Sequence, residues 1–303
     1  MFGLALVLAM QGVPAIPADS ARMPDDSTRR AQRLEAVQVT ATRGGAAAPV
    51  AASIVTKAQI ERRYGGEETP LLLARQPSLT AYSENGAASN YSYMRLRGMS
   101  QNRINISLDG VPLNEPEDQD LYFSNFPDFA NSVESVRIQR GVGTSTHGSA
   151  SYAGAVSFES IAIGAVKRGG ELQVGRGSFN TTRGSAEYQT GLVGGFAGYG
   201  RASAQQTDGY RENSGNRSRS FFASGGWFGA RDVVKLTAIG GISANELAYL
   251  AVPASELRSD RRANPLGAGE NDLFHQQMLS LAWTRTLSER TTVATTVYGF
   301  DAG

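Results

Sequence analysis

Few side chains in this sequence are equipped for covalent or metal chemistry. Its 303 residues include no cysteine and only two histidines, His147 and His275. A chain without cysteine has no disulfide, no thiolate ligand for zinc and no thiol nucleophile, and two imidazoles are too few for a multi-histidine metal site. Neither histidine lies near a serine flanked by glycines, so hydrolase chemistry has no support. We therefore expect a protein that is not an enzyme and that holds no cofactor.

The remaining candidate motifs for ion or nucleotide binding are weak. Four acidic residues gather between positions 115 and 120, but their spacing does not match an EF-hand loop, so a solvated loop is the preferred interpretation. The sequence Gly141-Val142-Gly143 is not followed by the rest of a dinucleotide fingerprint. Basic and acidic residues number 29 and 28, a balance that argues against a nucleic-acid partner. The sequence thus predicts neither a metal site nor nucleic-acid binding.

The first residues have the pattern of an export signal. An apolar run from Phe2 to Met10 precedes the helix breaker Pro14, and small residues follow as far as Ala18. This order predicts a signal peptide over residues 1–18. No basic residue precedes the run, so a buried strand or the start of a helix stays as the alternative. No later stretch contains the roughly 18 apolar residues that a transmembrane helix needs.

Residues 19–48 are predicted to be an arm with one isolated strand. The part up to Arg33 is polar and has no apolar periodicity, which is typical of disorder. Residues 34–43 are β-prone, with Val37 and Val39 on one face, and a flexible linker begins at Gly44. A lone strand between a disordered arm and a linker has no neighbour in sequence to pair with. Such a strand suits addition to the sheet edge of another protein.

Residues 49–165 carry mixed helical and strand signals, interrupted by glycine. Thr56 and Thr69 are the expected N-caps of two short helices, and Pro70 suits a first helical position. Such short elements predict a compact α+β domain. We expect helices over residues 57–63 and 69–75, and strands over 52–55, 94–97, 103–108, 133–139 and 153–159.

From residue 166 to residue 303 the pattern changes to period two. In residues 196–206, for example, Arg201, Ser203 and Gln205 fall on one face and mainly glycine and alanine fall on the other. Segments of about ten residues, joined alternately by short and long connections, are typical of tilted membrane-crossing strands. A water-soluble β-sandwich also alternates, but its strands carry larger apolar residues on the buried face. About seven strands are expected, over 170–176, 181–189, 196–206, 220–228, 233–242, 276–285 and 291–300.

Aromatic residues near the ends of these segments suit a girdle at a membrane interface. The candidates for this girdle are Tyr188, Phe196, Trp227, Phe228, Tyr298 and Phe300.

Five motifs follow one another between Leu34 and Ser160. They read EAVQVTATR from Glu35, LRGMS from Leu96, SLDGVP from Ser107, VESVRIQRG from Val133 and GSASYAGAVSF from Gly148. In this order and spacing they resemble the TonB box and the plug motifs of TonB-dependent outer-membrane receptors. The resemblance implies an α+β plug domain followed by antiparallel transmembrane β-barrel strands. A barrel of this family has about 22 strands, so we expect an incomplete barrel and the N-terminal portion of a longer protein.

The resemblance also implies which residues contact partners. The TonB-contacting residues would be Leu34, Glu35, Ala36, Val37, Gln38, Val39, Thr40 and Ala41. Arg97 and Arg140 would form ion pairs with glutamates of the barrel, because an unpaired buried guanidinium is costly. A solvent-exposed position or an ion pair within the plug is the equal alternative for both. Substrate would contact the plug apex through Tyr82, Tyr91, Tyr93, Gln119, Tyr122 and Phe123. Ordinary packing within the loops is the alternative for the aromatic residues among them.

The function implied is TonB-dependent uptake of a scarce large solute across the outer membrane of a Gram-negative cell. An Fe(III)-siderophore is the first expectation for the solute, and cobalamin or an oligosaccharide is the alternative. The implied partners are TonB, with ExbB and ExbD in the inner membrane, a small-molecule ligand such as a metal chelate, and outer-membrane lipid. Two other hypotheses stay open at this point: a soluble periplasmic α+β binding module and a non-functional gene fragment.

Overall fold

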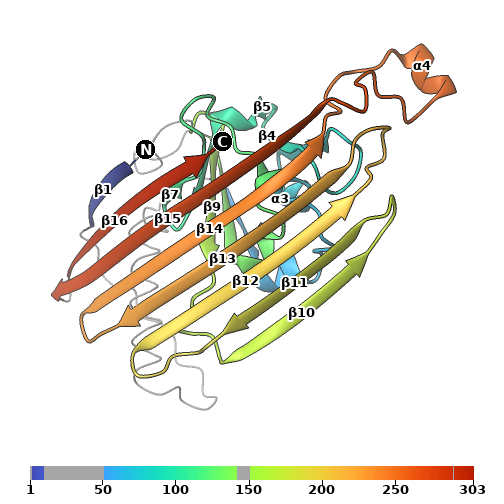
Figure 1. Cartoon of the computed structure of the whole chain (residues 1–303). Helices are drawn as coiled ribbons and strands as arrows, with labels where there is room; N and C mark the ends of the chain where they lie inside the picture. Colours follow the sequence, from blue (N-terminus) through green and yellow to red (C-terminus); the bar gives the residue numbers. More distant parts are fainter. Residues whose placement is uncertain (1, 10–50, 142–150, 289) are drawn as a thin grey trace.

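The computed structural model describes residues 2–9, 51–141, 151–288 and 290–303. These residues form one large antiparallel sheet and a smaller mixed domain with two sheets of its own (Figure 1). The expected cleavage point after Ala18 and the β-prone segment 34–43 lie outside the described residues. Residues Phe2–Ala9, within the expected signal peptide, form strand β1, which pairs with β16 at the edge of the large sheet. Because the expected cleavage point lies outside the described residues, the signal peptide over residues 1–18 stays a prediction.

The smaller domain contains the α and β elements that the sequence predicts, with one shifted N-cap and additional strands. Thr56 begins a capping box in which its backbone N–H donates to Gln59 Oε1 over 3.0 Å. The second helix begins at Thr69, so that Glu68 rather than Thr69 is its N-cap. A strand that the periodicity does not reveal, β3, pairs with β4. The elements are β2 (Ala52–Thr56), α2 (Lys57–Glu61), α3 (Thr69–Leu73), β3 (Leu79–Ser83), β4 (Ser92–Leu96), β5 (Met99–Ser100), η1 (Gln101–Arg103), β6 (Ile104–Leu108), β7 (Val111–Pro112), η2 (Phe123–Asn125), η3 (Phe129–Ser132), β8 (Val133–Arg140) and β9 (Gly154–Ser160).

The core of this domain lies on the sheet β2-β8-β9-β6-β7. Strand β6 is buried along its whole length, and β9 runs parallel to it on one side and antiparallel to β8 on the other. Gly154 begins β9 at φ 151°, and a Cβ there would lie 2.1 Å from the carbonyl oxygen of Gln139. Only glycine fits this close approach between β8 and β9. The glycine therefore sets how closely the two central strands pack.

The large sheet orders its strands β10 to β16 in sequence, each antiparallel to the next. Several strands run further than the alternation predicts. Asn216 donates to Asn245 Oδ1 over 2.7 Å from one strand to its neighbour, so polar residues extend β13 and β14 beyond the apolar pattern. The strands are β10 (Gly169–Arg176), β11 (Thr182–Gln189), β12 (Phe196–Thr207), β13 (Asn216–Phe228), β14 (Asp232–Glu246), β15 (Asn271–Ser288) and β16 (Thr291–Ala302), with α4 (Ala254–Ser259) in the connection between β14 and β15.

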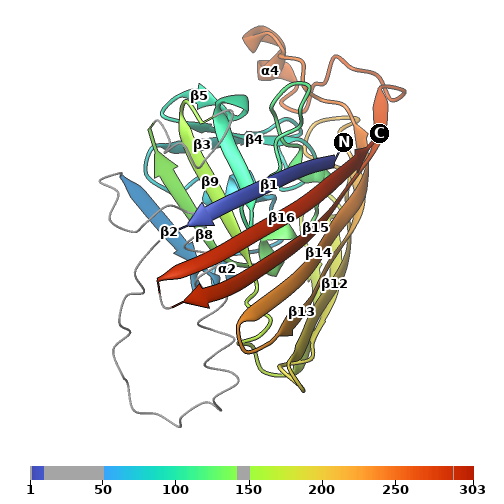
Figure 2. The same cartoon turned by 90° about the vertical axis from the view of Figure 1, so that its left-hand side faces the viewer.

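The large sheet curves around the smaller domain, which lies against its concave face (Figure 2). The long connections, including the one with α4, lie at one end of the strands, and the short turns lie at the other (Figure 1). On β12 the expected polar face is the inner one, since Arg201, Ser203 and Gln205 are buried. No helix in the described ranges is both long enough and apolar enough to cross a membrane.

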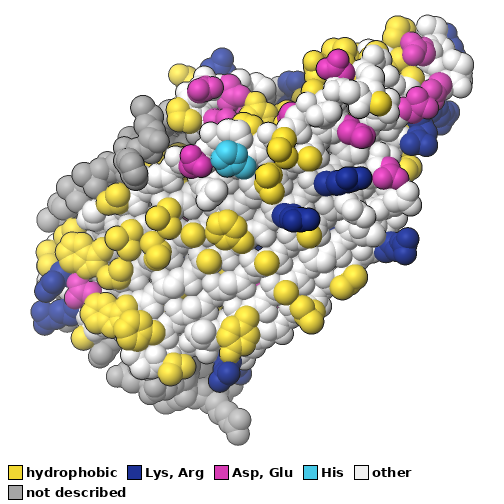
Figure 3. All heavy atoms as spheres, in the orientation of Figure 1, with side chains coloured by type: hydrophobic (Ala, Val, Ile, Leu, Met, Phe, Trp, Pro, Cys, Tyr) yellow, Lys and Arg dark blue, Asp and Glu magenta, His cyan; other side chains and the backbone are white. Residues whose placement is uncertain are grey.

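Apolar side chains are spread over the outer face of the sheet, and its charged side chains gather toward the strand ends (Figure 3). Tyr188, Phe196 and Trp227 are exposed there, as expected of an interfacial girdle. Trp283 joins them, because Trp227 and Trp283 both pair with Val234 of the strand between them. The other expected members face the smaller domain instead: Phe228 is buried, and Tyr298 and Phe300 pack against the core.

Candidate functional site

Four tyrosines gather at the end of the smaller domain that lies beside the long connections. Tyr82 on β3 and Tyr93 on β4 face each other with ring centroids 5.6 Å apart. Tyr91 stacks on Tyr93 at 6.4 Å, and Tyr122 meets Tyr91 edge to face at 5.6 Å. The sequence predicts all four as substrate contacts, and the fold brings them together. We call them the apex cluster; their contact with a substrate stays a prediction.

The two remaining apex candidates have different surroundings. Phe123 is 2 % exposed and packs edge to face against Phe158, so it belongs to the core and offers no surface to a solute. The expectation that it contacts substrate is wrong for this arrangement. Gln119 lies in the acidic loop, where its side chain donates to the carbonyl oxygens of Glu115 and Pro116 over 3.3 and 3.2 Å. Its contact with a substrate stays untested.

Carboxylates surround the apex cluster. The Tyr91 hydroxyl donates to Asp272, at the start of β15, and the Tyr122 hydroxyl donates to Asp118 Oδ2 over 2.6 Å. Burial raises the pKa of Glu84 to about 7 against the nearby charge of Arg211, and burial with three neighbouring acids raises the pKa of Glu115 to about 7. Glu84 and Asp272 carry no recognisable sequence signal, because the tyrosines that they face are distant in the chain.

Two buried asparagines tie the apex to the wall. Asn90 Nδ2 donates to the carbonyl oxygens of Ser214, Gly215 and Glu246 over 3.2, 3.2 and 2.9 Å. The carbonyl oxygen of Asn85 accepts from the backbone N–H groups of residues 210 and 211, both over 3.1 Å. The apex loop is therefore bonded directly to the connection between β12 and β13 and to the end of β14.

A buried ionic network joins the smaller domain to the sheet around Asp128. Its carboxylate is ion-paired with Arg183 of β11 and with Arg201 of β12, the latter at 3.4 Å. Tyr64 and Ser203 hydroxyls donate to the two carboxylate oxygens over 2.6 and 2.8 Å. Burial would raise the pKa of Asp128, but the Arg183 hydrogen bond and the charge of Arg201 outweigh it and lower that pKa. Asp128 is thus ionised and balances two guanidiniums.

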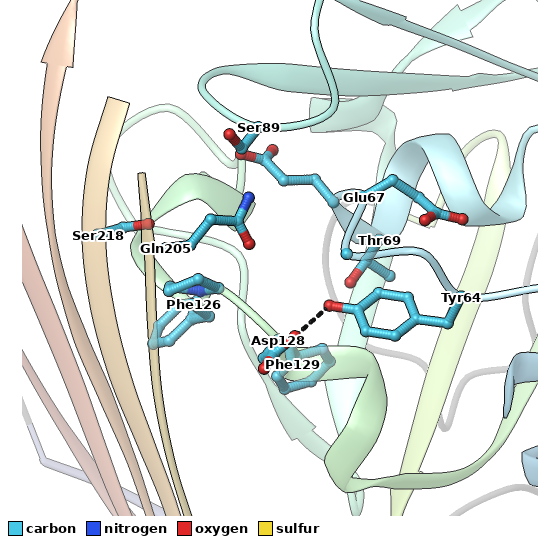
Figure 4. A pocket seen from close by; sticks show the side chains of 12 residues that line it. Tyr64, Glu67, Thr69, Ser89, Phe126, Asp128, Phe129, Gln205 and Ser218 are labelled. Atoms are coloured by element: carbon cyan, nitrogen blue, oxygen red, sulfur yellow. Dashed lines mark hydrogen bonds between the residues drawn. The ribbon is translucent and has the colours of Figure 1, made fainter. Parts of the chain in front are cut away.

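A small pocket opens beside this network, between the two parts of the chain (Figure 4). Tyr64 and Thr69 line it from the smaller domain, and Gln205 and Ser218 line it from β12 and β13. The polar lining continues the buried polar surface of the inner face of the sheet. The contact between domain and sheet therefore combines charges and hydrogen bonds with apolar packing.

A second ionic contact lies at Asp109, in the turn between β6 and β7. Asp109 and Gly110 both have positive φ, as expected of this turn dipeptide. The carboxylate also accepts from Lys235 Nζ of β14 over 3.1 Å and from the Ser160 hydroxyl over 2.6 Å. Burial opposes ionisation, but the charge of Lys235 outweighs it and lowers the pKa of Asp109. A turn residue in the sequence is therefore also an anchor to the wall.

In both ionic contacts the charges are placed the other way round from the expectation, in which arginines of the smaller domain pair with the sheet. In the described residues the smaller domain supplies the carboxylates and the sheet supplies the cations. Arg140 Nη1 donates to Ser53 Oγ over 3.2 Å, within the smaller domain. The Arg97 guanidinium lies against Gly141, within that domain as well. The pairing of Arg97 and Arg140 with barrel glutamates stays a prediction.

Comparison with known families decides what the smaller domain is. Residues 45–155 match the family model described as TonB-dependent Receptor Plug Domain. The smaller domain is a TonB-dependent receptor plug. The matched range contains β6, the turn at Asp109, β8 and all four tyrosines of the apex cluster. No curated protein matches the chain at a significant level.

Solved structures show the same arrangement of plug and curved antiparallel sheet. The ferric citrate transporter FecA in its unliganded form has a TM-score of 0.69 at 16% identity and covers 84% of this chain. The ferric-catecholate import receptor Fiu from E. coli K12, in its closed form, has a TM-score of 0.67 at 16% identity, and the match covers 86% of this chain. The siderophore receptor PiuA from Acinetobacter baumannii has a TM-score of 0.61 at 15% identity, and the match covers 84% of this chain. These likenesses establish the fold, a plug against strands of a receptor-like barrel that is not closed here.

The chain spans well under half of the length of these structures. It covers 40% of the FecA chain, 38% of the Fiu chain and 37% of the PiuA chain.

Proposed function

We propose that this chain belongs to an active importer of Fe(III) chelates in the outer membrane, driven by TonB. The observation that carries the proposal is the plug domain, matched over residues 45–155, whose described residues lie against the concave face of a curved antiparallel sheet. Solved structures with the same fold are receptors and transporters for ferric citrate, ferric catecholates and siderophores. In this proposal the plug is a gate, and the chain is not an enzyme, because moving a chelate needs no covalent step.

The outer face of the sheet supports contact with lipid. On β14 every second residue from Val234 to Ala244 is apolar or glycine, and the charged residues Asp232 and Glu246 follow at the two ends. Ten residue steps at about 3.3 Å give about 33 Å along the strand. A strand tilt of about 40° reduces this to roughly 25 Å, the height of the apolar band of an outer-membrane barrel. A water-soluble module would not need this band.

Coupling to the inner membrane is assigned to residues 34–43. In our proposal, solute binding at the apex cluster frees this segment, which then adds as a strand to TonB. Force from TonB, supplied by ExbB and ExbD, acts on the plug and breaks its contacts with the wall. The Asp128 and Asp109 ion pairs are the buried contacts that must then separate.

Growth under iron limitation tests the proposal. Cells that lack their own receptors are supplied with the complete gene and with single ferric chelates of the hydroxamate, catecholate and carboxylate classes. We expect at least one chelate to restore growth, only in cells with an intact tonB gene. Deletion of residues 34–43 should abolish uptake and leave chelate binding unchanged. Rescue by no chelate would remove the iron proposal, and rescue without TonB would remove the coupling.

A further inference from the structure

The apex cluster has the geometry of a surface that attracts cations. Each of its four rings contacts at least one other, with centroids between 5.6 and 6.4 Å apart, at the end of the plug beside the long connections. The face of a tyrosine ring is electron-rich and attracts ammonium and guanidinium groups. In Tyr91 and Tyr122 the hydroxyl also donates to a carboxylate, which increases the electron density of the ring. The cluster therefore favours a positive charge at its faces.

One cation of the chain itself already takes such a position. The guanidinium of Arg95 lies over the ring of Tyr82, 5.9 Å from its centroid. Arg95 is on the same strand as Tyr93, two residues further on, so both side chains leave β4 on one side. This contact shows the geometry in which a ligand cation would meet the remaining rings.

The charges around the cluster point to the same ligand. Five carboxylates surround it, which we call the acidic rim: Glu84, Glu115, Asp118, Asp120 and Asp272. Besides Arg95, the cation identified near the rim is Arg211, whose guanidinium donates to the carbonyl oxygens of Ala248, Leu250 and Ala263. In the described residues no side chain donates a hydrogen bond to Glu84. The rim therefore holds more carboxyl groups than cations. A ligand cation beside it would favour the ionised form of Glu84 and Glu115, whose pKa values are raised to about 7 without a ligand.

We propose that the apex cluster and its acidic rim bind the cationic part of the imported solute, so that the cargo carries a protonated amine or a guanidinium. The proposal rests on the proposed function as an importer and narrows its substrate class. A polyanionic chelate would meet the acidic rim with repulsion at close range and low dielectric. A cation would meet both ring faces and carboxylates, and each attraction grows as water leaves the surface.

A set of chelates that differ only in charge tests this selectivity. Ferrioxamine B carries a protonated amine on a ferric trihydroxamate; its N-acetyl form is neutral, and its N-succinyl form bears a carboxylate. Binding to the purified protein in detergent is measured by calorimetry. We expect the cationic form to bind about tenfold more tightly than the neutral form, and the anionic form to bind weakest. Equal affinities, the reverse order, or no binding of any of the three would overturn the proposal.

Substitutions at Tyr93 separate charge recognition from packing. Tyr93→Leu removes the ring and should weaken binding of the cationic chelate about threefold to thirtyfold, with the neutral form unaffected. Tyr93→Phe keeps the ring and should bind the cation within about threefold of the parent protein. An equal loss for both chelates in Tyr93→Leu would show simple packing and would overturn the proposal. Glu84→Gln should also weaken the cationic form selectively.

Growth experiments distinguish this proposal from the proposed function. If anionic ferric chelates restore growth through TonB as well as cationic ones do, the cluster does not select cations, and the importer function stands. If no ferric chelate of either charge restores growth, the importer function itself fails.

Discussion

Asp128→Asn tests whether the buried ionic network holds the plug in the wall. The substitution keeps the size of the side chain and removes its charge. The two guanidiniums that it faces are nearly excluded from solvent, with 9 % of the Arg183 side chain and 2 % of the Arg201 side chain exposed. Removing one partner of a buried pair costs about 3–5 kcal/mol, because the remaining charge stays buried without compensation. We therefore expect the plug–wall contact to open more readily by that free energy.

The absence of cysteine from the chain provides a direct assay. Ala130 is buried in η3, two residues from Asp128, so Ala130→Cys places a unique thiol beneath the contact. When the protein opens and closes faster than the reagent reacts, the labelling rate follows the opening equilibrium. A cost of 3–5 kcal/mol corresponds to roughly 150- to 5,000-fold faster labelling after Asp128→Asn.

A matched control and a second substitution make the result specific. Asp301→Asn removes a carboxylate that pairs with His275 at the surface, where 76 % of the aspartate side chain is exposed, and it should change labelling little. Adding Arg201→Gln to Asp128→Asn should recover part of the loss, because it removes one uncompensated charge. Labelling within about threefold of the parent protein, or no faster than in the control, would refute the reasoning.

Three further substitutions test other contacts. Burial raises the pKa of Glu68 from 4.5 to about 8, so its contribution to stability is complete below pH 4.5 and is lost as the pH rises through 8. Glu84 and Glu115, with pKa values of about 7, contribute to the same slope, so Glu68→Gln should reduce it, measured as urea midpoints across this range. An unchanged slope would contradict the assignment. Gly154→Ala forces a Cβ against the Gln139 carbonyl and should lower the thermal midpoint by at least about 5 °C, whereas Gly267→Ala, in open space, should not. Asn90→Ala leaves three wall carbonyls without their donor, at about 1–3 kcal/mol, and should speed amide exchange of residues 210 and 211 about tenfold or more. Unchanged exchange would show that the asparagine does not join apex and wall.

The local features of this protein are readable from its sequence. Period two along β12 identifies Arg201, Ser203 and Gln205 as the inner face, because successive side chains of a strand point to opposite sides. The dipeptide at Asp109 and Gly110 predicts its turn, because both residues accept positive φ at low cost. These signals depend on neighbours within a few residues, so no knowledge of the remaining chain is required.

The contacts that hold plug to wall were decided only by the tertiary structure. Asp128 meets Arg183 across 55 positions in sequence, and Asp109 meets Lys235 across 126. No periodicity links residues so far apart, and the charge of Arg201 on an inner face shows only that some carboxylate must lie opposite. Phe123 shows that a single position can be ambiguous too. An aromatic residue beside an apex tyrosine has the same sequence signal whether it faces a solute or the core. Its place was decided by Phe129 and Phe158, which pack around it in the folded plug.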